Sequence, residues 1–235
     1  MAGFALTRAA ASLCEGVSRR LVSVNHATMR AQPPEPAPAI GATKNMSAGI
    51  AAIASFLGLP QRGRHERAGF VLYGAAVAAA RDPYLYAALG VPDTLDGRFD
   101  LVGLHASLLI RRLRHAPEPG AALAQAVFDA MFADMDINLR ELGVGDMTIG
   151  KRVRAMWEAF HGRASAYEAA LDQSDNAMLA KAIARNLWRG DPAPEGAAAA
   201  LARLMRAQDA HLSTQPMARL RLGEVGFLGA EIAQR

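Results

Sequence analysis

Apolar residues recur along this chain at the spacing of α-helices, and turn-forming residues separate the segments that they define. Between residues 98 and 114, for example, Phe99, Val102, Leu109 and Leu113 fall on one face of a helix. The same pattern predicts helices over 48–57, 66–80, 84–89, 98–114, 120–140, 176–188 and 196–212, and from 149 onward. Runs of β-branched residues are scarce, so we predict an all-α fold, a single compact multi-helix domain.

Prolines, glycines and capping residues mark where these helices begin and end. Pro83 disfavours helix at the residue before it, and therefore separates 66–80 from 84–89. Thr148 and Asp175 are candidate N-caps, because a side-chain oxygen at that position accepts a hydrogen bond from the first turn. The basic stretch 61–67 is interpreted as a turn. The helix from 149 either continues through 163–171 or gives way there to a second helix.

The two ends of the chain differ in composition from its middle. Residues 1–45 are basic, and the proline-rich stretch 32–38 breaks any helix there, so we expect a flexible N-terminal extension. A start at Met46 and an organelle transit peptide are the two alternatives for this segment. Residues 46–212 form the predicted helical domain, and the glycine-containing residues 213–235 are expected to be a flexible C-terminal tail.

Composition narrows the class of protein further. Half of the 235 residues are hydrophobic (51%), which is enough for a sizeable core. The net charge of +4 favours weak attraction to nucleic acid, ribosomes or anionic lipid. A single cysteine, Cys14, excludes an internal disulfide. The longest apolar run, 68–80, is too short to span a bilayer, so we expect a buried core helix and, at most, peripheral membrane contact.

No motif of a known catalytic or metal centre stands out in the chain. Gly-x-Ser-x-Gly, a Walker-type loop and His-Glu-x-x-His are all missing from the sequence, so we expect no enzyme, no cofactor and no metal site. Asp134 and Asp136 lie two residues apart and therefore face different sides of a helix. His105 lies between apolar neighbours and is interpreted as a packing residue, with Asp129 as a candidate partner.

Two clusters of basic residues lie at helix ends. Arg111, Arg112 and Arg114 end one predicted helix, where cations interact favourably with the helix dipole. The second cluster opens the helix from 149, where the dipole disfavours cations, and it consists of Lys151, Arg152 and Arg154. This placement indicates either a contact with phosphate, ribosomal RNA or an acidic partner, or an ordinary solvated face. We expect no DNA binding.

Four segments together resemble a known family. They are ARDPYLYAALGVPDTLDGRFDLVGLH (80–105), FADMDINLRELGVGDMTIGKRVRAM (132–156), FHGRASAY (160–167) and ARNLW (184–188). In this order they resemble the ubiquinol–cytochrome c chaperones, which assist the assembly of respiratory complex III in mitochondria and α-proteobacteria. The resemblance covers about half of the chain.

The resemblance implies an all-α assembly chaperone without catalytic residues. Its client would be newly synthesised cytochrome b, met near the ribosome exit region and, in mitochondria, together with a small co-chaperone. The corresponding location is the cytoplasm or the cytoplasmic face of a bacterial inner membrane, or the mitochondrial matrix and inner membrane. The candidate partner-binding residues are Asp93, Asp96, Arg98, Arg140, Glu141, Asp146, Lys151, Arg152, Arg154, Trp157, Phe160 and Arg163.

Each of these polar residues also has a structural interpretation. Asp93, Asp96 and Asp100 are able to cap and anchor the loop at 90–97 and the helix start after it. Arg140 and Glu141 are able to pair across the turn at 143–146, with Asp96, Asp146 or Arg163 as partners. An apolar client groove is expected around Met131, Met156, Trp157 and Phe160. The rival hypotheses are a haem-linked protein using His65, His105, His115 and His161, and a basic module that binds RNA or lipid surfaces.

Overall fold

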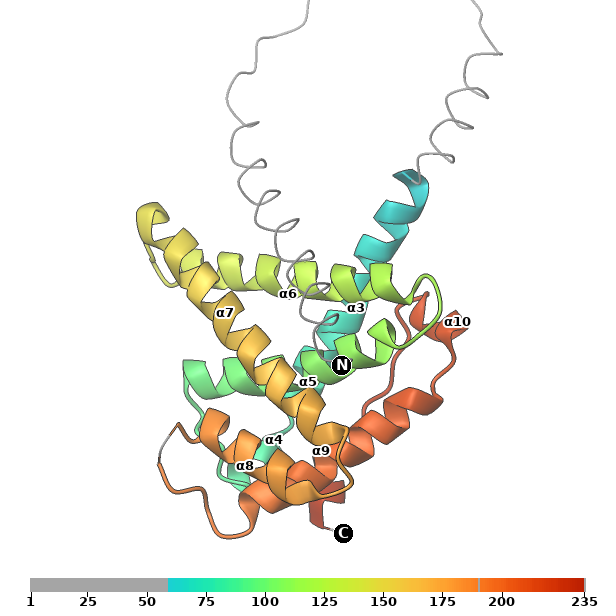
Figure 1. Ribbon diagram of the computed structural model, residues 1–235. Helices are drawn as coiled ribbons and strands as arrows, with labels where there is room; N and C mark the ends of the chain where they lie inside the picture. The colour runs from blue at the N-terminus through green and yellow to red at the C-terminus, as the bar shows by residue number, and fades with distance from the viewer. Residues whose placement is uncertain (1–58, 190, 235) are drawn as a thin grey trace, which may run out of the picture. The chain divides into compact units, whose positions relative to one another are not determined.

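The computed structural model describes residues 59–189 and 191–234, with the side chains of 59–62 and 234 left out. The predicted helix 48–57 and the expected extension 1–45 lie outside the described residues. In the described part the prediction of an all-α fold is confirmed (Figure 1). The elements are α3 (Leu59–Ala80), α4 (Pro83–Ala87), α5 (Leu95–Arg114), α6 (Gly120–Glu141), α7 (Asp146–Leu171), α8 (Asn176–Leu187), α9 (Ala197–Thr214), α10 (Met217–Leu220) and the 3-10 helix η1 (Ala230–Gln234).

Helix α5 is the centre of the packing. Every residue from Asp100 to Leu109 is buried, so α5 is covered on all sides rather than along one stripe. Helices α3, α6, α7, α8 and α9 all contact it. The helices that carry the family-like segments are therefore held against one common element.

Helix α3 packs on α6 and α5 along one of its faces. Leu72 and Ala76 are fully buried there, and the Tyr73 hydroxyl donates a hydrogen bond of 2.7 Å to Asp134. The helix begins at Leu59, so the stretch 61–67 is helical and its interpretation as a turn is wrong. Of these seven residues only Gly63 has poor helix propensity, which explains why the helix continues through them.

The remaining helix boundaries follow simple caps. Thr94 caps α5 by accepting a hydrogen bond from the Gly97 amide, and Asp175 caps α8 as predicted. Helix α7 is continuous over 26 residues, which resolves the open alternative at 163–171. It begins earlier than predicted, with Gly145 at the N-cap, and Thr148 lies inside the first turn. There the Thr148 hydroxyl donates to the Gly145 carbonyl instead of capping the helix.

The C-terminal segment packs on the domain, whereas the sequence analysis expected a flexible tail from residue 213. The Gln208 amide exchanges two hydrogen bonds with the Leu228 backbone, at 2.8 and 2.9 Å. Gln215 forms the same reciprocal pair with Gly226, and the side chain of Leu220 is fully buried. The two glutamine side chains supply hydrogen bonds to backbone groups of this segment that have no partner in a helix or sheet. The glycine content of the sequence does not reveal these contacts.

Within residues 59–189 and 191–234, no helix combines the length and the apolar character that crossing a bilayer requires. The apolar run 68–80 in α3 is buried on one side only. Phe70 and Val71 are 55% and 58% exposed, so the expectation of a fully buried core helix is wrong for this face.

The close approach of α3 to α6 generates the first prediction. A Cβ at Gly69 would lie 2.6 Å from the backbone carbonyl carbon of Ala126, whereas one at Gly74 would meet nothing within 4 Å. Gly69→Ala should therefore destabilise the fold by about 1–3 kcal/mol through overpacking. Gly74→Ala, the control in the same helix, should be neutral or stabilise by up to about 1 kcal/mol. Urea unfolding measures both values, and equal effects of the two substitutions would contradict this packing.

Buried His105 makes stability depend on pH. Desolvation lowers the pKa of His105, whose Nδ1 lies 2.9 Å from the Leu101 carbonyl and whose ring meets Phe227 edge-on. Below the ordinary histidine pKa of about 6.5, His105 binds a proton in the unfolded chain but not in the folded chain. The free energy of unfolding should therefore fall as pH drops below about 6.5. In His105→Leu the free energy of unfolding should depend less steeply on pH. If the pH dependence is the same in this variant, other groups cause it.

Candidate functional site

A buried carboxylate joins three parts of the chain. The Asp100 side chain on α5 has no exposed surface, and guanidinium groups from Arg163 on α7 and Arg189 after α8 bind its two oxygens. Burial raises the pKa of the Asp100 carboxyl, and the two arginines oppose that shift. Since an unpaired buried carboxylate is strongly disfavoured, the packing of α5 against α7 and the end of α8 depends on both arginines.

Arg189 also connects Asp100 to the start of α5. Its guanidinium also binds Asp96 at 2.7 Å, so one side chain holds two carboxylates one turn apart. The Arg189 backbone has a positive φ of 49°, an uncommon conformation for a residue other than glycine. The sequence analysis missed Arg189, although it directly follows the ARNLW segment.

Two further contacts tie the same segments together. Asn186 donates a hydrogen bond of 3.0 Å to the Tyr167 hydroxyl, and burial raises the pKa of Tyr167 to about 12 although that bond lowers it. The Trp188 indole donates to the Gly90 carbonyl at 3.1 Å. The segments 80–105, 160–167 and 184–188 therefore converge, and we call Asp96, Asp100, Arg163, Tyr167, Asn186, Trp188 and Arg189 the polar junction.

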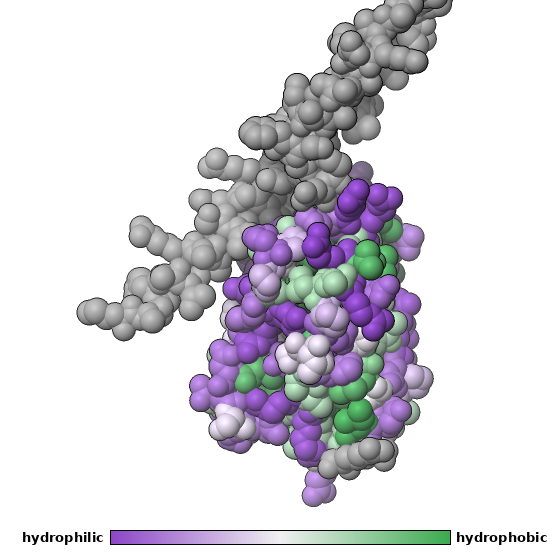
Figure 2. Space-filling view, turned by 90° about the vertical axis from the view of Figure 1, so that its right-hand side faces the viewer, coloured by the Kyte–Doolittle hydropathy of each residue, from purple (hydrophilic) through white to green (hydrophobic). Residues whose placement is uncertain are grey.

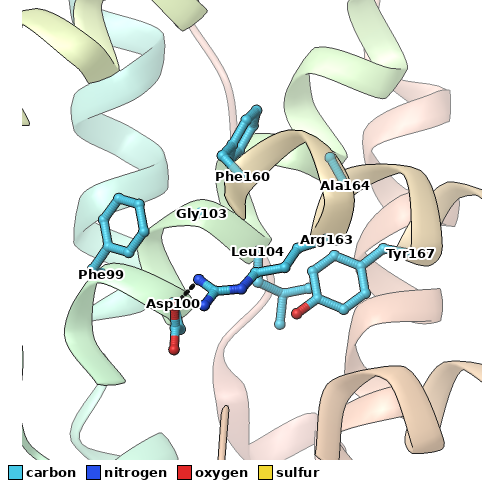
Figure 3. Close-up of a pocket in the computed structure, with 8 residues that line it drawn as sticks. All are labelled: Phe99, Asp100, Gly103, Leu104, Phe160, Arg163, Ala164 and Tyr167. Atoms are coloured by element: carbon cyan, nitrogen blue, oxygen red, sulfur yellow. Dashed lines mark hydrogen bonds and ion pairs between the residues drawn. The ribbon is translucent and has the colours of Figure 1, made fainter. Parts of the chain in front are cut away.

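A small recess opens beside the polar junction, between α5 and α7 (Figure 3). It is lined by Phe99, Asp100, Gly103, Leu104, Phe160, Arg163, Ala164 and Tyr167. In the close-up, Arg163 reaches from α7 toward Asp100, and the Tyr167 ring lies beside them. The recess offers room for about one water molecule, whereas ligand sites usually enclose hundreds of Å³. It therefore suits an ordered water better than a substrate.

Aromatic side chains gather above this recess, between α6 and α7. Phe160 is buried and packs on Phe128 and Phe132, with ring centroids 5.8 and 6.2 Å away. Trp157 is half-buried and its ring lies 4.4 Å from that of His161. Phe160 and Met131 are thus core residues rather than walls of an open groove, while Trp157 and Met156 keep part of their surface.

The structure does not bring the other candidate residues together into one site. Arg98 pairs locally with Asp93, and Arg140 pairs with Asp136 and Asp146 across the α6–α7 turn. The predicted partner Asp146 is thus confirmed for Arg140, whereas Asp96 and Arg163 belong to the polar junction instead. Glu141 is exposed at the end of α6.

The two basic clusters differ in how far neighbouring groups neutralise them. Arg111 pairs with Glu168, Asp172 and Asp209, and the Arg112 guanidinium donates to the Leu212 and Gln215 carbonyls. That cluster, which Arg114 completes by pairing with Glu168, therefore serves the fold. In the second cluster Arg154 pairs with Glu158 one turn on, while Lys151 and Arg152 are exposed on α7.

The histidines and acids of the described residues do not gather into a metal-binding group. Across residues 59–189 and 191–234, no three histidine, cysteine or acidic side chains converge as metal ligands would. Asp129 is exposed and accepts a hydrogen bond from Gln125, whereas His105 is buried with its Nδ1 at the Leu101 carbonyl, so the structure does not support the predicted pairing of the two. Desolvation also lowers the pKa of His161, which packs among aromatic rings.

Comparison with known proteins decides the family. The model of the ubiquinol–cytochrome c chaperone family matches residues 87–227, which is more than half of the chain. The chain belongs to this family. The match includes the whole polar junction, begins at the last residue of α4 and leaves α3 out.

Two relatives of the ubiquinol–cytochrome c chaperone family agree with this assignment. A ubiquinol–cytochrome c reductase complex assembly factor 1 from Xenopus laevis is 27% identical over 97 residues, which are 41% of this chain and 48% of that protein. The match thus spans about half the length of this curated relative. The crystal structure of the Cbp3 homolog from Brucella abortus superposes with a TM-score of 0.66 at 32% identity, covering 74% of this chain and 96% of that one.

The polar junction is expected to be a requirement of the fold. Asp100→Asn removes the charge that Arg163 and Arg189 bind, and should lower the free energy of unfolding by about 3 kcal/mol. Asp93→Asn, which breaks only the exposed pair with Arg98, is the matched control and should leave thermal unfolding unchanged. If calorimetry finds both variants equally stable, the ion pairs around Asp100 do not hold the helices together.

Proposed function

We propose that this chaperone binds newly made cytochrome b and keeps it competent for assembly into respiratory complex III. Membership of the ubiquinol–cytochrome c chaperone family is the single observation that carries the proposal. The similarity to the structure of the Cbp3 homolog and the similarity in sequence to the complex III assembly factor also support it. The choice of cytochrome b as the client is our inference for this chain.

The arrangement of the described residues suits protein binding better than small-molecule chemistry. The charged side chains that converge do so in ion pairs around Asp100, beside a recess with room for about one water molecule. A client with apolar helices needs an apolar counterpart on the chaperone. Large apolar side chains that are more than half exposed include Phe70, Val71, Leu142 and Met147.

Several charged candidates remain available to a partner under this proposal. Lys151 and Arg152 are exposed on α7, on the same helix as half-buried Trp157. Cations beside apolar surface favour a partner that combines apolar helices with acidic or phosphate groups. A nascent membrane protein still held at the ribosome offers both.

Deleting the gene tests the proposal directly. Cytochrome b and quinol–cytochrome c reductase activity should both fall several-fold, because the unassembled client is left exposed to aggregation and proteolysis. Immunoblotting of membranes and a reductase assay measure the two effects, and a plasmid copy of the gene should restore them. Cytochrome c oxidase provides the control, since its level should be less affected. Normal cytochrome b and normal reductase activity in the deletion strain would refute the proposed function.

A further inference from the structure

The second part of α3, residues 68–80, is apolar around its whole circumference, yet one side of it is exposed. Residues 68–80 carry no charged side chain. One face, formed by Ala68, Leu72, Tyr73, Ala76 and Ala80, is buried against the domain. A helix that is hydrophobic all round is normally buried all round, so the opposite face calls for a partner.

The uncovered side of α3 consists of Phe70, Val71, Gly74 and Ala78, all of them exposed, and we call it the outer face. Leu222, after α10, is 73% exposed and extends the apolar surface, since the adjoining Gly223 lies against Val71. The space-filling view of the side where α3 and α10 lie shows hydrophobic areas among hydrophilic ones (Figure 2). Exposed apolar surface that spans two elements is typical of a binding surface.

The shape of the outer face favours a helix as the occupant. A Cβ added at Gly74 would meet nothing within 4 Å, so the middle of the face is open and carries no side chain, next to the larger Phe70 and Val71. Small residues at the centre of a helix face allow another helix to approach closely. The run 68–80 is about 20 Å long, which corresponds to an occupant of three to four turns.

Charge brackets the same face at both ends. Arg67 and Arg81 are exposed, and their separation of about four turns places them on the same side of α3 as Gly74. Glu66, the acidic residue of α3, is already engaged within the chain. Two cations around a charge-free apolar stretch are complementary to an apolar helix that carries acidic side chains near its ends.

We propose that the outer face of α3 is where this chaperone holds an apolar helix of its client, with acidic residues of that helix meeting Arg67 and Arg81. The inference rests on the proposed function and assigns a surface to it. It goes beyond the family match, which begins at residue 87 and leaves α3 out.

Two other occupants fit the charges less well. If α3 of a second copy packed on this face, arginines would meet arginines in both the parallel and the antiparallel direction, at a cost. The chain's own residues 1–58 carry the cations Arg8, Arg19, Arg20, Arg30 and Lys44 against the acids Glu15 and Glu35. This excess of positive charge also repels Arg67 and Arg81.

Photocrosslinking of the full-length protein in its native cells tests the assignment. A benzoylphenylalanine placed at Val71 or Ala78 should crosslink to an apolar helix of cytochrome b, identified by mass spectrometry of the joined peptides. Introducing Gly74→Arg should reduce this crosslink about tenfold or more, because a bulky charge then occupies the middle of the binding face.

The control variant is Gly162→Arg, at an exposed position of α7 about three turns from Lys151 and Arg152, where an added Cβ also meets nothing within 4 Å. It should leave the crosslink at Val71 unchanged. Thermal unfolding of both variants should match or exceed that of the unmodified protein, since arginine has a higher helix propensity than glycine. A loss of crosslinking without a loss of stability thus reports on the surface itself.

Other crosslinking results would overturn the assignment. A product with residues 1–58 of the same chain, with a second copy or with lipid would identify another occupant, and a cytochrome b crosslink that survives Gly74→Arg would place the client elsewhere. Capture of cytochrome b from Trp157 but not from Val71 or Ala78 would refute this surface and leave the proposed function standing. Capture from none of these positions, together with normal complex III in the deletion strain, would refute both.

Discussion

The Asp100 carboxylate constrains the whole arrangement, because it is buried with its charge and needs two cations around it. Arg163 comes from α7 and Arg189 from the end of α8, so these elements can reach their places only together. The same contacts explain why residues far apart in sequence carry the family resemblance: Asp100, Arg163 and the ARNLW segment meet at one junction. What looks in sequence like a set of binding motifs is largely the architecture of the helical domain.

This architecture commits several of the motif residues to contacts within the fold. Phe160 is part of an aromatic core, and Arg163 and Asp96 are committed to ion pairs. Surface that fits a partner lies away from the junction, on the outer face of α3 and near Lys151 and Arg152 on α7. A chaperone of this kind can therefore keep a rigid interior while its apolar exterior adapts to a client.

Periodicity and capping were sufficient to predict the all-α fold and most helix positions, since both depend on residues near one another. Asp175 at the start of α8 is one such local signal. The polar junction was not predictable in the same way, because nothing near Asp100 in sequence indicates Arg189 as its partner. The burial of α3 was misjudged for a related reason. An all-apolar segment indicates that a helix is buried, but its sequence does not show which faces the domain covers. The C-terminal segment was misjudged because its order depends on two glutamines of α9 and the turn after it.

Those glutamines have a consequence for where the folding unit ends. Gln208 is 1% exposed, and the backbone of Leu228 satisfies its amide. A chain shortened before that residue would leave a buried amide without partners on α9, the helix that packs against central α5. Loss of Leu228 would thus weaken the packing of α9 on α5. Trimming that removes this residue would lower the stability of the entire domain.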